Sequence, residues 1–401
     1  MLTRVVLCAL LLASTEIACT TDTVTAAALA TQGWAAEMRG EDSEAARLYK
    51  LSAAQGNAPA EANLGFFYQT GRGGLPKDGG QAARLYKLSA DQGNALGQAN
   101  LGFSYETGLG GLPKDDREAA RLYKLSADQG NAQGQANLGV FYSTGRGSLP
   151  KDEGQAARLY KLSADQGNAF GQANLGVFYS TGRGGLPKDE GQAARLYKLS
   201  ANQGNALGQA NLGFFYSTGR GSLPKDEGQA ARLYKLSADQ GNALGQANLG
   251  FFYQTGLGGL PKDEGQAARL YKLSADQGNA LGQADLGVLY EIGHGGLPKD
   301  DGQAARLYKL SADQGNALGQ ANLGGFYASG RGGLPRDDRE ATRLYRLSAD
   351  QGNAAGQANL GFFYATGRGG LPKDDREAAR LYRLAADQGS AYAQAALSRL
   401  K

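Results

Sequence analysis

The sequence is poor in the residue types that build most metal sites, disulfides and catalytic centres. It contains 2 cysteines, 1 histidine, 1 tryptophan and 2 methionines among 401 residues. Both cysteines, Cys8 and Cys19, lie near the amino terminus, so the remainder of the chain can form no internal disulfide. A single histidine, His294, offers neither a pair of imidazoles for a metal nor a base that recurs. We therefore predict no metal, no cofactor and no catalytic residue.

An excess of charge of one sign is also missing. Lysine and arginine number 42, aspartate and glutamate number 38, and both signs recur along the whole chain. Proteins that hold a nucleic-acid backbone usually gather their basic residues on one face or stripe. This composition therefore argues against nucleic acid as a partner.

The chain consists mostly of copies of one 37-residue segment. All prolines except Pro59 occupy the same place in the copy, and no residue is inserted or deleted between copies. Such a period is typical of a solenoid, in which each copy buries its apolar face on its neighbours. A marker tyrosine recurs at Tyr49, Tyr86, Tyr123, Tyr160, Tyr197, Tyr234, Tyr271, Tyr308, Tyr345 and Tyr382.

The first half of each copy predicts an amphipathic helix with one solvent-exposed face. Asp78 and, three residues later, Gln81 match a capping box at the helix start. The polar residues Gln81, Arg84, Lys87 and Asp91 advance by three or four and form a single stripe. The other positions are predicted to face away from solvent: Ala82, Ala83, Leu85, Tyr86, Leu88 and Ala90.

The second half predicts another helix, from about Ala95 to Thr107, that ends at Gly108. Gly93 is suited to ending the first helix, and Asn94 is suited to capping the amides of the second. The positions predicted to point inward are Ala95, Ala99, Leu101, Phe103 and Tyr105.

Two glycines, Gly97 and Gly102, lie inside this second helix and recur in nearly every copy. An interior glycine costs about 1 kcal/mol relative to alanine, so close approach of a neighbouring helix is the expected reason for keeping them. The glycine-rich loop that follows cannot form regular structure, and its Leu112 is predicted to anchor it on the next repeat.

Two loops, beginning at Ser148 and Ser222, contain the Ser-x-x-Lys motif of penicillin-interacting enzymes. That enzyme motif places serine and lysine one helical turn apart, whereas here a proline separates them within a loop. We therefore expect no nucleophilic serine at either loop.

Four segments of each copy resemble the successive segments of Sel1-like repeats: Ala-Ala-Arg-Leu-Tyr, Ala-Asp-Gln-Gly-Asn-Ala, Ala-Asn-Leu-Gly-x-x-Tyr and Gly-x-Gly-Gly-Leu-Pro-Lys-Asp. They occur in this order over about residues 41–401, with a linking loop one residue longer than the commonest form of the family. The resemblance implies an all-α fold, a right-handed α/α superhelical solenoid of stacked helix-turn-helix units similar to tetratricopeptide repeats.

The resemblance also implies a function, because the family is associated with assembling protein complexes, often in bacterial envelope and signalling roles. We therefore expect a non-enzymatic scaffold or adaptor that binds a protein or peptide. The alternative is an envelope enzyme acting on β-lactams or peptidoglycan, since some cysteine-rich Sel1-like proteins have been linked to β-lactam hydrolysis.

The amino-terminal segments follow one another in the order found in secretory signal peptides. One basic residue, Arg4, precedes an apolar run from Val5 to Ala13 that is too short to span a bilayer, and small polar residues follow it. We expect export to the periplasm or beyond and no transmembrane span in the mature chain. An uncleaved anchor is one alternative, and lipidation of Cys19, giving an outer-membrane lipoprotein, is another.

These segments give the expected domain organisation. Trp34 and Met38 mark a helix that is predicted to cover the open end of the first repeat. The predicted parts are a signal peptide at residues 1–25, an N-terminal capping helix at 26–40, tandem repeats at 41–388 and a C-terminal capping helix at 389–401.

Positions that vary among otherwise uniform copies are candidates for partner binding. They include Phe170 in the second helix, and Glu106 and Ser143 directly after the second tyrosine. Drift among the copies is the alternative reading of this variation. The loop arginines, which recur at one place, are the main candidates, unless each one bonds the carbonyl groups ending its own second helix. They are Arg72, Arg146, Arg183, Arg220, Arg331 and Arg368.

Overall fold

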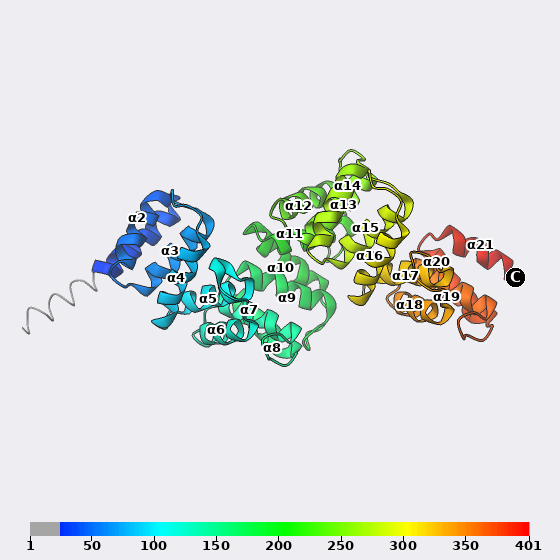
Figure 1. Cartoon of the computed structure of the whole chain (residues 1–401), viewed down its shortest axis with the longest axis horizontal. Coiled ribbons are helices and arrows are strands. Elements are labelled where there is room, and N and C mark those ends of the chain that lie inside the picture. Colours follow the sequence, from blue (N-terminus) through cyan, green and yellow to red (C-terminus); the bar gives the residue numbers. More distant parts are fainter. Residues whose placement is uncertain (1–24, 401) are drawn as a thin grey trace, which may run out of the picture. The chain divides into compact units, whose positions relative to one another are not determined.

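A computed structural model describes residues 25–400, and the regular structure in this range is entirely helical (Figure 1). The described chain divides into two compact units, one ending at Leu199 and the other beginning at Ser200. Helix α10 (Glu190–Asn202) contains this boundary. Each unit consists of helical hairpins, so the all-α repeat fold predicted from the sequence is confirmed.

Even-numbered helices are the first helices of the repeats and odd-numbered helices are the second. The chain enters through a helix over residues 25–38. The first unit continues with α2 (Asp42–Ala53), α3 (Ala58–Thr70), α4 (Gly79–Asp91), α5 (Ala95–Thr107), the short 3-10 helix η1 (Leu109–Gly111), α6 (Asp116–Asp128), α7 (Ala132–Thr144), α8 (Glu153–Asp165) and α9 (Ala169–Thr181). The second unit contains α11 (Ala206–Thr218), α12 (Glu227–Asp239), α13 (Ala243–Thr255), α14 (Glu264–Asp276), α15 (Ala280–Ile292), α16 (Asp301–Asp313), α17 (Ala317–Ser329), α18 (Asp338–Asp350), α19 (Ala354–Thr366), α20 (Asp375–Asp387) and α21 (Ala391–Arg399).

The predicted caps begin the helices. The Asp78 carboxylate accepts the Gln81 amide at 3.0 Å, and the Asn94 side chain accepts the Gly97 amide at 2.9 Å. The backbone half of the capping box is used differently, because the Asp78 amide donates to the Tyr68 carbonyl at 2.8 Å. That bond joins each first helix to the second helix of the preceding repeat.

A buried tyrosine forms the centre of each repeat, and Tyr123 is representative. Its ring meets Phe141 edge-on, with ring centroids 5.4 Å apart, and the loop residue Leu149 packs against the same cluster. A Cβ atom added at Gly102 would lie 2.8 Å from the Tyr123 ring, which is closer than real contacts allow. The prediction that this glycine permits close helix packing is therefore confirmed.

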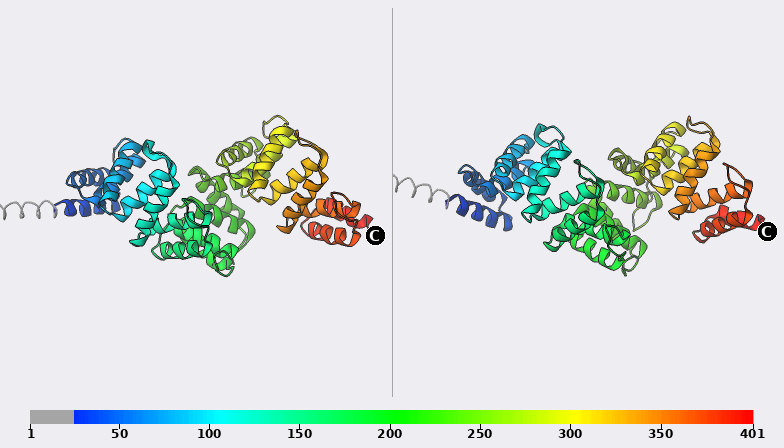
Figure 2. Two further views of the ribbon diagram at one scale, coloured as in Figure 1. Left: turned by 60° about the horizontal axis from the view of Figure 1, so that its bottom comes forward. Right: turned by 90° about the horizontal axis from the view of Figure 1, so that it is seen from below.

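Buried polar groups tie each repeat to the one before it. The Ser126 hydroxyl donates to the Ala95 carbonyl at 2.7 Å, and the Gln129 amide donates to the Gln98 side chain at 2.7 Å. Because a buried hydroxyl without a partner is costly, such bonds favour one register between repeats. Figure 2 shows from two further sides that successive hairpins pack side by side within each unit.

Two predictions about burial are wrong. Leu88 and Phe103 are exposed, whereas both were expected to face inward. Leu88 lies four residues after Arg84 and three before Asp91, so helical geometry places it within the polar stripe. In the second helix it is Ser104, next to Phe103, that is fully buried.

The two ends of the described chain repeat the same packing in altered form. Gly33 of the first helix lies against the Tyr49 ring, and the Ser52 hydroxyl donates to the Ala26 carbonyl at 2.6 Å, as in complete repeats.

Residues 1–24, which include Cys8 and Cys19 of the expected signal segment, lie outside the described residues. Within residues 25–400, no helix is both long enough and apolar enough to cross a membrane.

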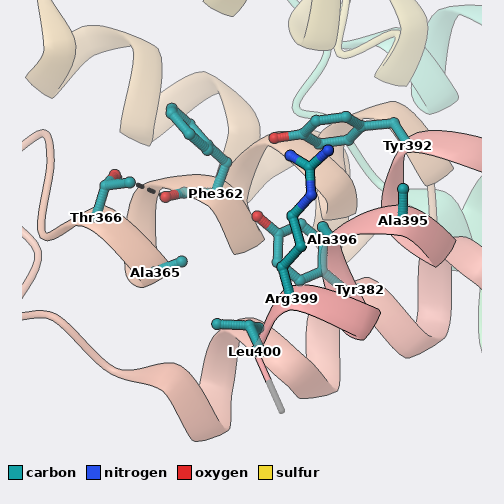
Figure 3. A pocket seen from close by; sticks show the side chains of 9 residues that line it. All are labelled: Phe362, Ala365, Thr366, Tyr382, Tyr392, Ala395, Ala396, Arg399 and Leu400. Atoms are coloured by element: carbon teal, nitrogen blue, oxygen red, sulfur yellow. Dashed lines mark hydrogen bonds between the residues drawn. The ribbon is translucent and has the colours of Figure 1, made fainter.

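The last helix, α21, has 9 residues instead of 13 and leaves a pocket of about 270 Å³ beside it (Figure 3). Phe362 lies on one side of this pocket, and Tyr382 and Tyr392 lie on the other. Leu400 stands 37 residues after Phe363, at a position where most of the other repeats have phenylalanine. The pocket therefore follows from the shortened final repeat.

Candidate functional site

The loop arginines are held by side chains of the repeat array itself, as Arg146 shows. Its Nε and Nη2 donate to the Asp116 carboxylate at 3.0 and 2.7 Å, and its Nη1 donates to Glu106 at 2.7 Å. The guanidinium also lies 4.6 Å from the centre of the Phe141 ring. Its hydrogen bonds hold the pKa of Asp116 below the usual range. The arginine thus clamps the repeat's first helix to its own second helix and to the second helix before it.

The same contact recurs at the other candidates. Their carboxylate partners come from the start of the first helix of the same repeat, and in two cases from the preceding helix as well. The pairs are Arg72 with Asp42 and Glu37, Arg183 with Glu153, Arg331 with Asp301 and Glu291, and Arg368 with Asp338. Arg220 lies over the rings of Phe214 and Phe215, at 5.6 and 5.3 Å from their centres.

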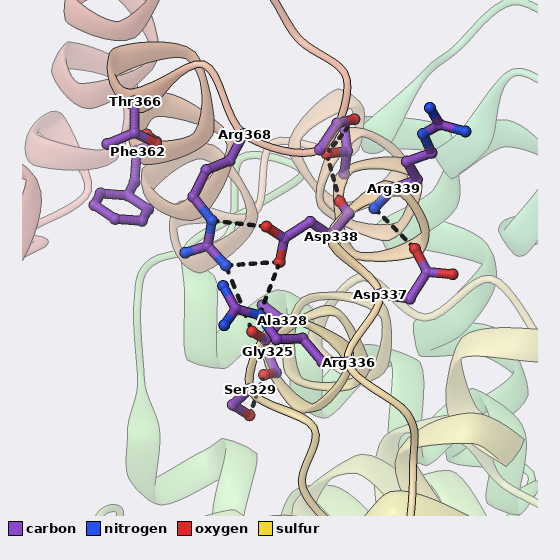
Figure 4. A network of polar contacts seen from close by, with 12 residues as sticks. Gly325, Ala328, Ser329, Arg336, Asp337, Asp338, Arg339, Phe362, Thr366 and Arg368 are labelled. Carbon is purple, nitrogen blue, oxygen red and sulfur yellow. Dashed lines mark hydrogen bonds and ion pairs between the residues drawn. The ribbon is translucent and has the colours of Figure 1, made fainter.

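Figure 4 shows this network around Arg368. Its guanidinium contacts the Asp338 carboxylate at 2.6 Å, and Arg336 approaches the same carboxylate at 3.7 Å. The alternative in which each arginine side chain bonds carbonyl groups at the end of its own second helix is wrong for Arg146 and Arg368. Arg368 does reach one carbonyl, at 3.5 Å, but this belongs to Ala328 of the preceding repeat.

Variation at the loop position follows variation at the start of the first helix. Where Gly79 replaces the acid, Leu109 replaces the arginine, and a Cβ at Gly79 would lie 3.0 Å from the Leu109 side chain. His294 contacts Glu264 at 3.0 Å, so it takes the place of the arginine in its repeat. Leu257 is an exception, and its carboxylate Glu227 pairs with a lysine instead. Most of this variation therefore has a packing reason inside the repeat.

The variable position after the second tyrosine also has an internal role. Glu106 accepts the hydroxyl of the buried Tyr123 at 2.7 Å, while Ser143 faces Tyr160 at 3.5 Å. Burial raises the pKa of Tyr160 to about 12, so its phenol remains a donor at neutral pH. Glu106 and Ser143 therefore already have partners inside the repeat array.

Phe170 lies apart from the arginines. It is half-buried in the first turn of α9, where its carbonyl accepts the Asn174 side chain at 2.9 Å. Arg183 follows the last turn of the same 13-residue helix, about 20 Å away along the helix axis. The structure does not bring these two candidates into one site.

A different surface repeats in both units, namely the face of the first helices on which leucines are exposed. Each of these leucines is 39–44% exposed, although its helix packs against neighbouring helices. They are Leu51, Leu88, Leu125, Leu162 and Leu199 in the first unit, and Leu236, Leu273, Leu310, Leu347 and Leu384 in the second.

Pockets lie on this surface between consecutive first helices. One of about 250 Å³ lies between α6 and α8, and one of about 280 Å³ lies at the equivalent place between α14 and α16. We call this repeated feature the first-helix groove. In the first unit it is lined by Lys124, Ala127 and Asp128 of α6, by Leu138 and Tyr142 of α7, and by Gln155, Arg158, Leu159 and Leu162 of α8.

The groove combines apolar contact with hydrogen-bonding groups. In the first unit Leu162 provides an apolar wall, while Arg158 and Lys124 provide cationic donors and Asp128 an acceptor. Pockets of this kind hold the side chains of a bound chain, with polar groups fixing its orientation. The sequence contained a signal for the exposure of these leucines, because each one shares a helical face with the polar stripe, but no local signal for the pockets between the helices.

The described residues contain no group of three histidine, cysteine, aspartate or glutamate side chains that could hold a metal ion.

The Sel1 repeat model matches the chain in ten successive stretches between residues 39 and 390. The chain belongs to the Sel1 repeat family. Similar solved structures include a protective antigen of uropathogenic Escherichia coli with an SLR fold, at 35% identity over 94% of this chain and 79% of that one, with a TM-score of 0.45. A Sel1 repeat protein from Oxalobacter formigenes is 29% identical over 61% of this chain and 96% of that one, with a TM-score of 0.47. No curated protein matches the chain.

Proposed function

We propose that this Sel1 repeat protein is a non-enzymatic scaffold or adaptor that holds a protein or peptide segment in the first-helix groove. The observation that supports this proposal most strongly is the recurrence of one pocket, with equivalent residues, in both units. Repeat proteins use such extended arrays of small sites to bind a long, unstructured segment. Each site contributes little, so several must act together.

We further propose that the protein is exported to the bacterial periplasm or beyond, with lipidation at Cys19 as the alternative. The proposal rests on Arg4 and the apolar run behind it. Cell fractionation and the intact mass of the mature protein test both points. A full-length cytoplasmic product would contradict export, and a mass increased by acyl chains on Cys19 would favour the lipoprotein.

The enzyme alternative has no support from the Ser-x-x-Lys loops. The Ser148 hydroxyl accepts a hydrogen bond from Arg117 at 2.8 Å, and Lys151 contacts Glu153 at 3.5 Å. Serine and lysine thus each engage a different residue. We expect no turnover of nitrocefin or muropeptides by the purified protein, and measurable hydrolysis would favour the enzyme.

Partner capture from an envelope extract tests the scaffold proposal. Replacing the exposed leucines Leu236, Leu273 and Leu310 by serine should abolish capture without unfolding the protein, because these side chains are not buried. Phe214→Ser with Phe251→Ser is the matched control, since these phenylalanines are similarly exposed on second helices. Equal capture by both variants would show that the groove is not the binding surface.

A further inference from the structure

The arginines of the first helices fall into two classes. Where glutamate stands three residues before the arginine, the two side chains form a two-point ion pair, as Arg121 does with Glu118 at 2.8 and 2.6 Å. The other members of this class are Arg47 with Glu44, Arg343 with Glu340 and Arg380 with Glu377.

Where glutamine replaces that glutamate, the guanidinium makes no ion pair or hydrogen bond to any residue in the described part of the chain. Arg158 and Arg306 belong to this class, and each lines one of the two groove pockets. A guanidinium presents a planar fork of donors that matches a carboxylate. The full class is Arg84, Arg158 and Arg195 in the first unit, and Arg232, Arg269 and Arg306 in the second.

The second unit places three of these unpaired arginines in consecutive repeats. Arg232, Arg269 and Arg306 come from α12, α14 and α16, and each lies one helical turn before an exposed leucine of the same helix. Every repeat of this stretch therefore presents one unpaired cation beside one exposed apolar side chain.

We propose that the first-helix face of α12, α14 and α16, which includes the pocket between α14 and α16, binds an extended acidic segment of a protein. Its carboxylate side chains pair with Arg232, Arg269 and Arg306, and its apolar side chains pack on the neighbouring leucines. This inference rests on the proposed scaffold function and specifies the chemistry of the partner.

The charges of the groove favour a peptide over a nucleic acid. Asp276 lines the same pocket as Lys272 and Arg306, so a ligand must tolerate one carboxylate in each repeat. A phosphodiester backbone carries a negative charge on every nucleotide, so any register of a bound nucleic acid places a phosphate close to that carboxylate, which repels it. A peptide can place an uncharged residue there and an acidic residue on the arginine.

A triple substitution removes the unpaired charges without removing the arginines. In Gln229→Glu, Gln266→Glu and Gln303→Glu, each new glutamate reproduces the pair that Glu340 forms with Arg343 at 2.6 Å. The fold should therefore be retained, as circular dichroism will show. The probe is a fluorescein-labelled 15-residue peptide of repeated Glu-Leu-Ser, measured by fluorescence anisotropy.

We expect the mature protein to bind this peptide and the triple variant to bind it about tenfold or more weakly, because each exposed ion pair contributes up to about fivefold. The converse variant, Glu340→Gln with Glu377→Gln, unpairs Arg343 and Arg380 and should strengthen binding. Affinity should fall as salt is raised.

Other results overturn the inference and leave distinct conclusions. Equal binding of a Gln-Leu-Ser peptide would show a peptide groove without acidic preference. Tighter binding of a single-stranded RNA of similar length would favour nucleic acid. Absence of peptide binding, together with partner capture that still depends on the groove leucines, would contradict this inference alone. Failure of the parent protein to capture any partner would contradict the proposed function itself.

Discussion

Two loop residues adopt a backbone conformation that suits glycine better. Ser148 and Ser222 have φ of 66° and 62°, whereas the equivalent residue Gly259 has φ of 78°. A side chain in this left-handed region costs about 1 to 2 kcal/mol, so replacing serine by glycine removes that cost. The greater conformational freedom of glycine in the unfolded chain offsets part of this stabilisation.

We therefore predict that Ser222→Gly raises the free energy of unfolding by about 0.5 to 1 kcal/mol. Gly259→Ser is the converse change and should lower it by a similar amount, because nothing else crowds the added Cβ atom. Urea denaturation at unchanged slope measures both effects. Equal stability of the two variants and the parent would show that the loop relaxes to accommodate serine.

A partly buried aspartate, Asp285, is predicted to make stability depend on pH near neutrality. Asp285 replaces the asparagine that in α13 is Asn248, whose side chain donates to the Leu244 carbonyl at 2.9 Å. An ionised carboxylate cannot donate in that way, and burial raises the pKa of Asp285 to about 7. Burial raises the pKa of Tyr271 and of Tyr308, and the charge of Asp285 raises both further.

The folded state therefore holds the Asp285 proton more tightly than the unfolded state does. Stability should fall as pH rises from about 4 to about 7, and the loss should be complete above that range. We predict that Asp285→Asn is more stable than the parent by roughly 2 to 4 kcal/mol at pH 8 and about equal at pH 4. Thermal denaturation of the parent and of Asp285→Asn between pH 4 and pH 8 measures this difference in stability. A constant difference at all pH values would show that the carboxyl group is not the cause.

Single residues also show where prediction from sequence stops. Caps and packing glycines such as Asn94 and Gly102 could be predicted, because their signals lie within a few residues. The partners of Arg146 could not, since Asp116 and Glu106 lie 30 and 40 residues earlier in the chain. Their proximity depends on how whole repeats stack.

At the level of helices, glycines set how closely neighbours approach. A Cβ at Gly213 of α11 would lie 2.9 Å from the Tyr234 ring of α12, while Gly219 ends α11 with φ of 68°. We predict that Gly213→Leu costs about 1 to 3 kcal/mol or more by overpacking, and that Gly219→Ser costs about 1 kcal/mol. Denaturant midpoints will separate them. Equal losses would mean that Gly213 is not at a close contact.

The arginine clamp joins three helices, and its loss should be measurable. Arg146→Leu removes both ion pairs and leaves Asp116 and Glu106 without their cation. Because the site is about one-third exposed, we predict a loss of about 1 kcal/mol at neutral pH. The loop itself accommodates leucine, as Leu109 shows.

The pH dependence of that loss follows from Asp116, whose pKa Arg146 lowers. A lowered carboxyl pKa adds stability above the ordinary pKa, and this stability disappears as pH falls through the folded value. The difference between parent and Arg146→Leu should therefore shrink below about pH 4. Arg158→Leu is the control, and this change should stay within about 0.5 kcal/mol of the parent. A similar loss in both variants would indicate that leucine, and not the missing pair, is responsible.

For the whole molecule, the period of the sequence predicts more than any one residue does. Nearly every copy has its own caps, its own tyrosine core and the same length, so the all-α repeat fold could be derived from local patterns. The first-helix groove could not be derived in the same way. Which face of α6 and α8 remains open depends on the position of α7 between them, and that position is a property of the stack.

Stability in such a stack is approximately a sum of repeat and neighbour terms, so removing one full period should preserve the fold. Deleting residues 243–279, which match one Sel1 repeat, joins Asn242 to Ala280 and recreates the cap that Asn242 now makes. We predict an unchanged helical signal per residue and a denaturant slope about one-tenth smaller, because the slope scales with the surface exposed on unfolding. Deleting only residues 243–260 is the control, since it removes α13 and leaves the apolar faces of α12 and α14 without their partner. That variant should aggregate or unfold. If the full-period deletion unfolded as readily as the control, the repeats would depend on contacts beyond their neighbours.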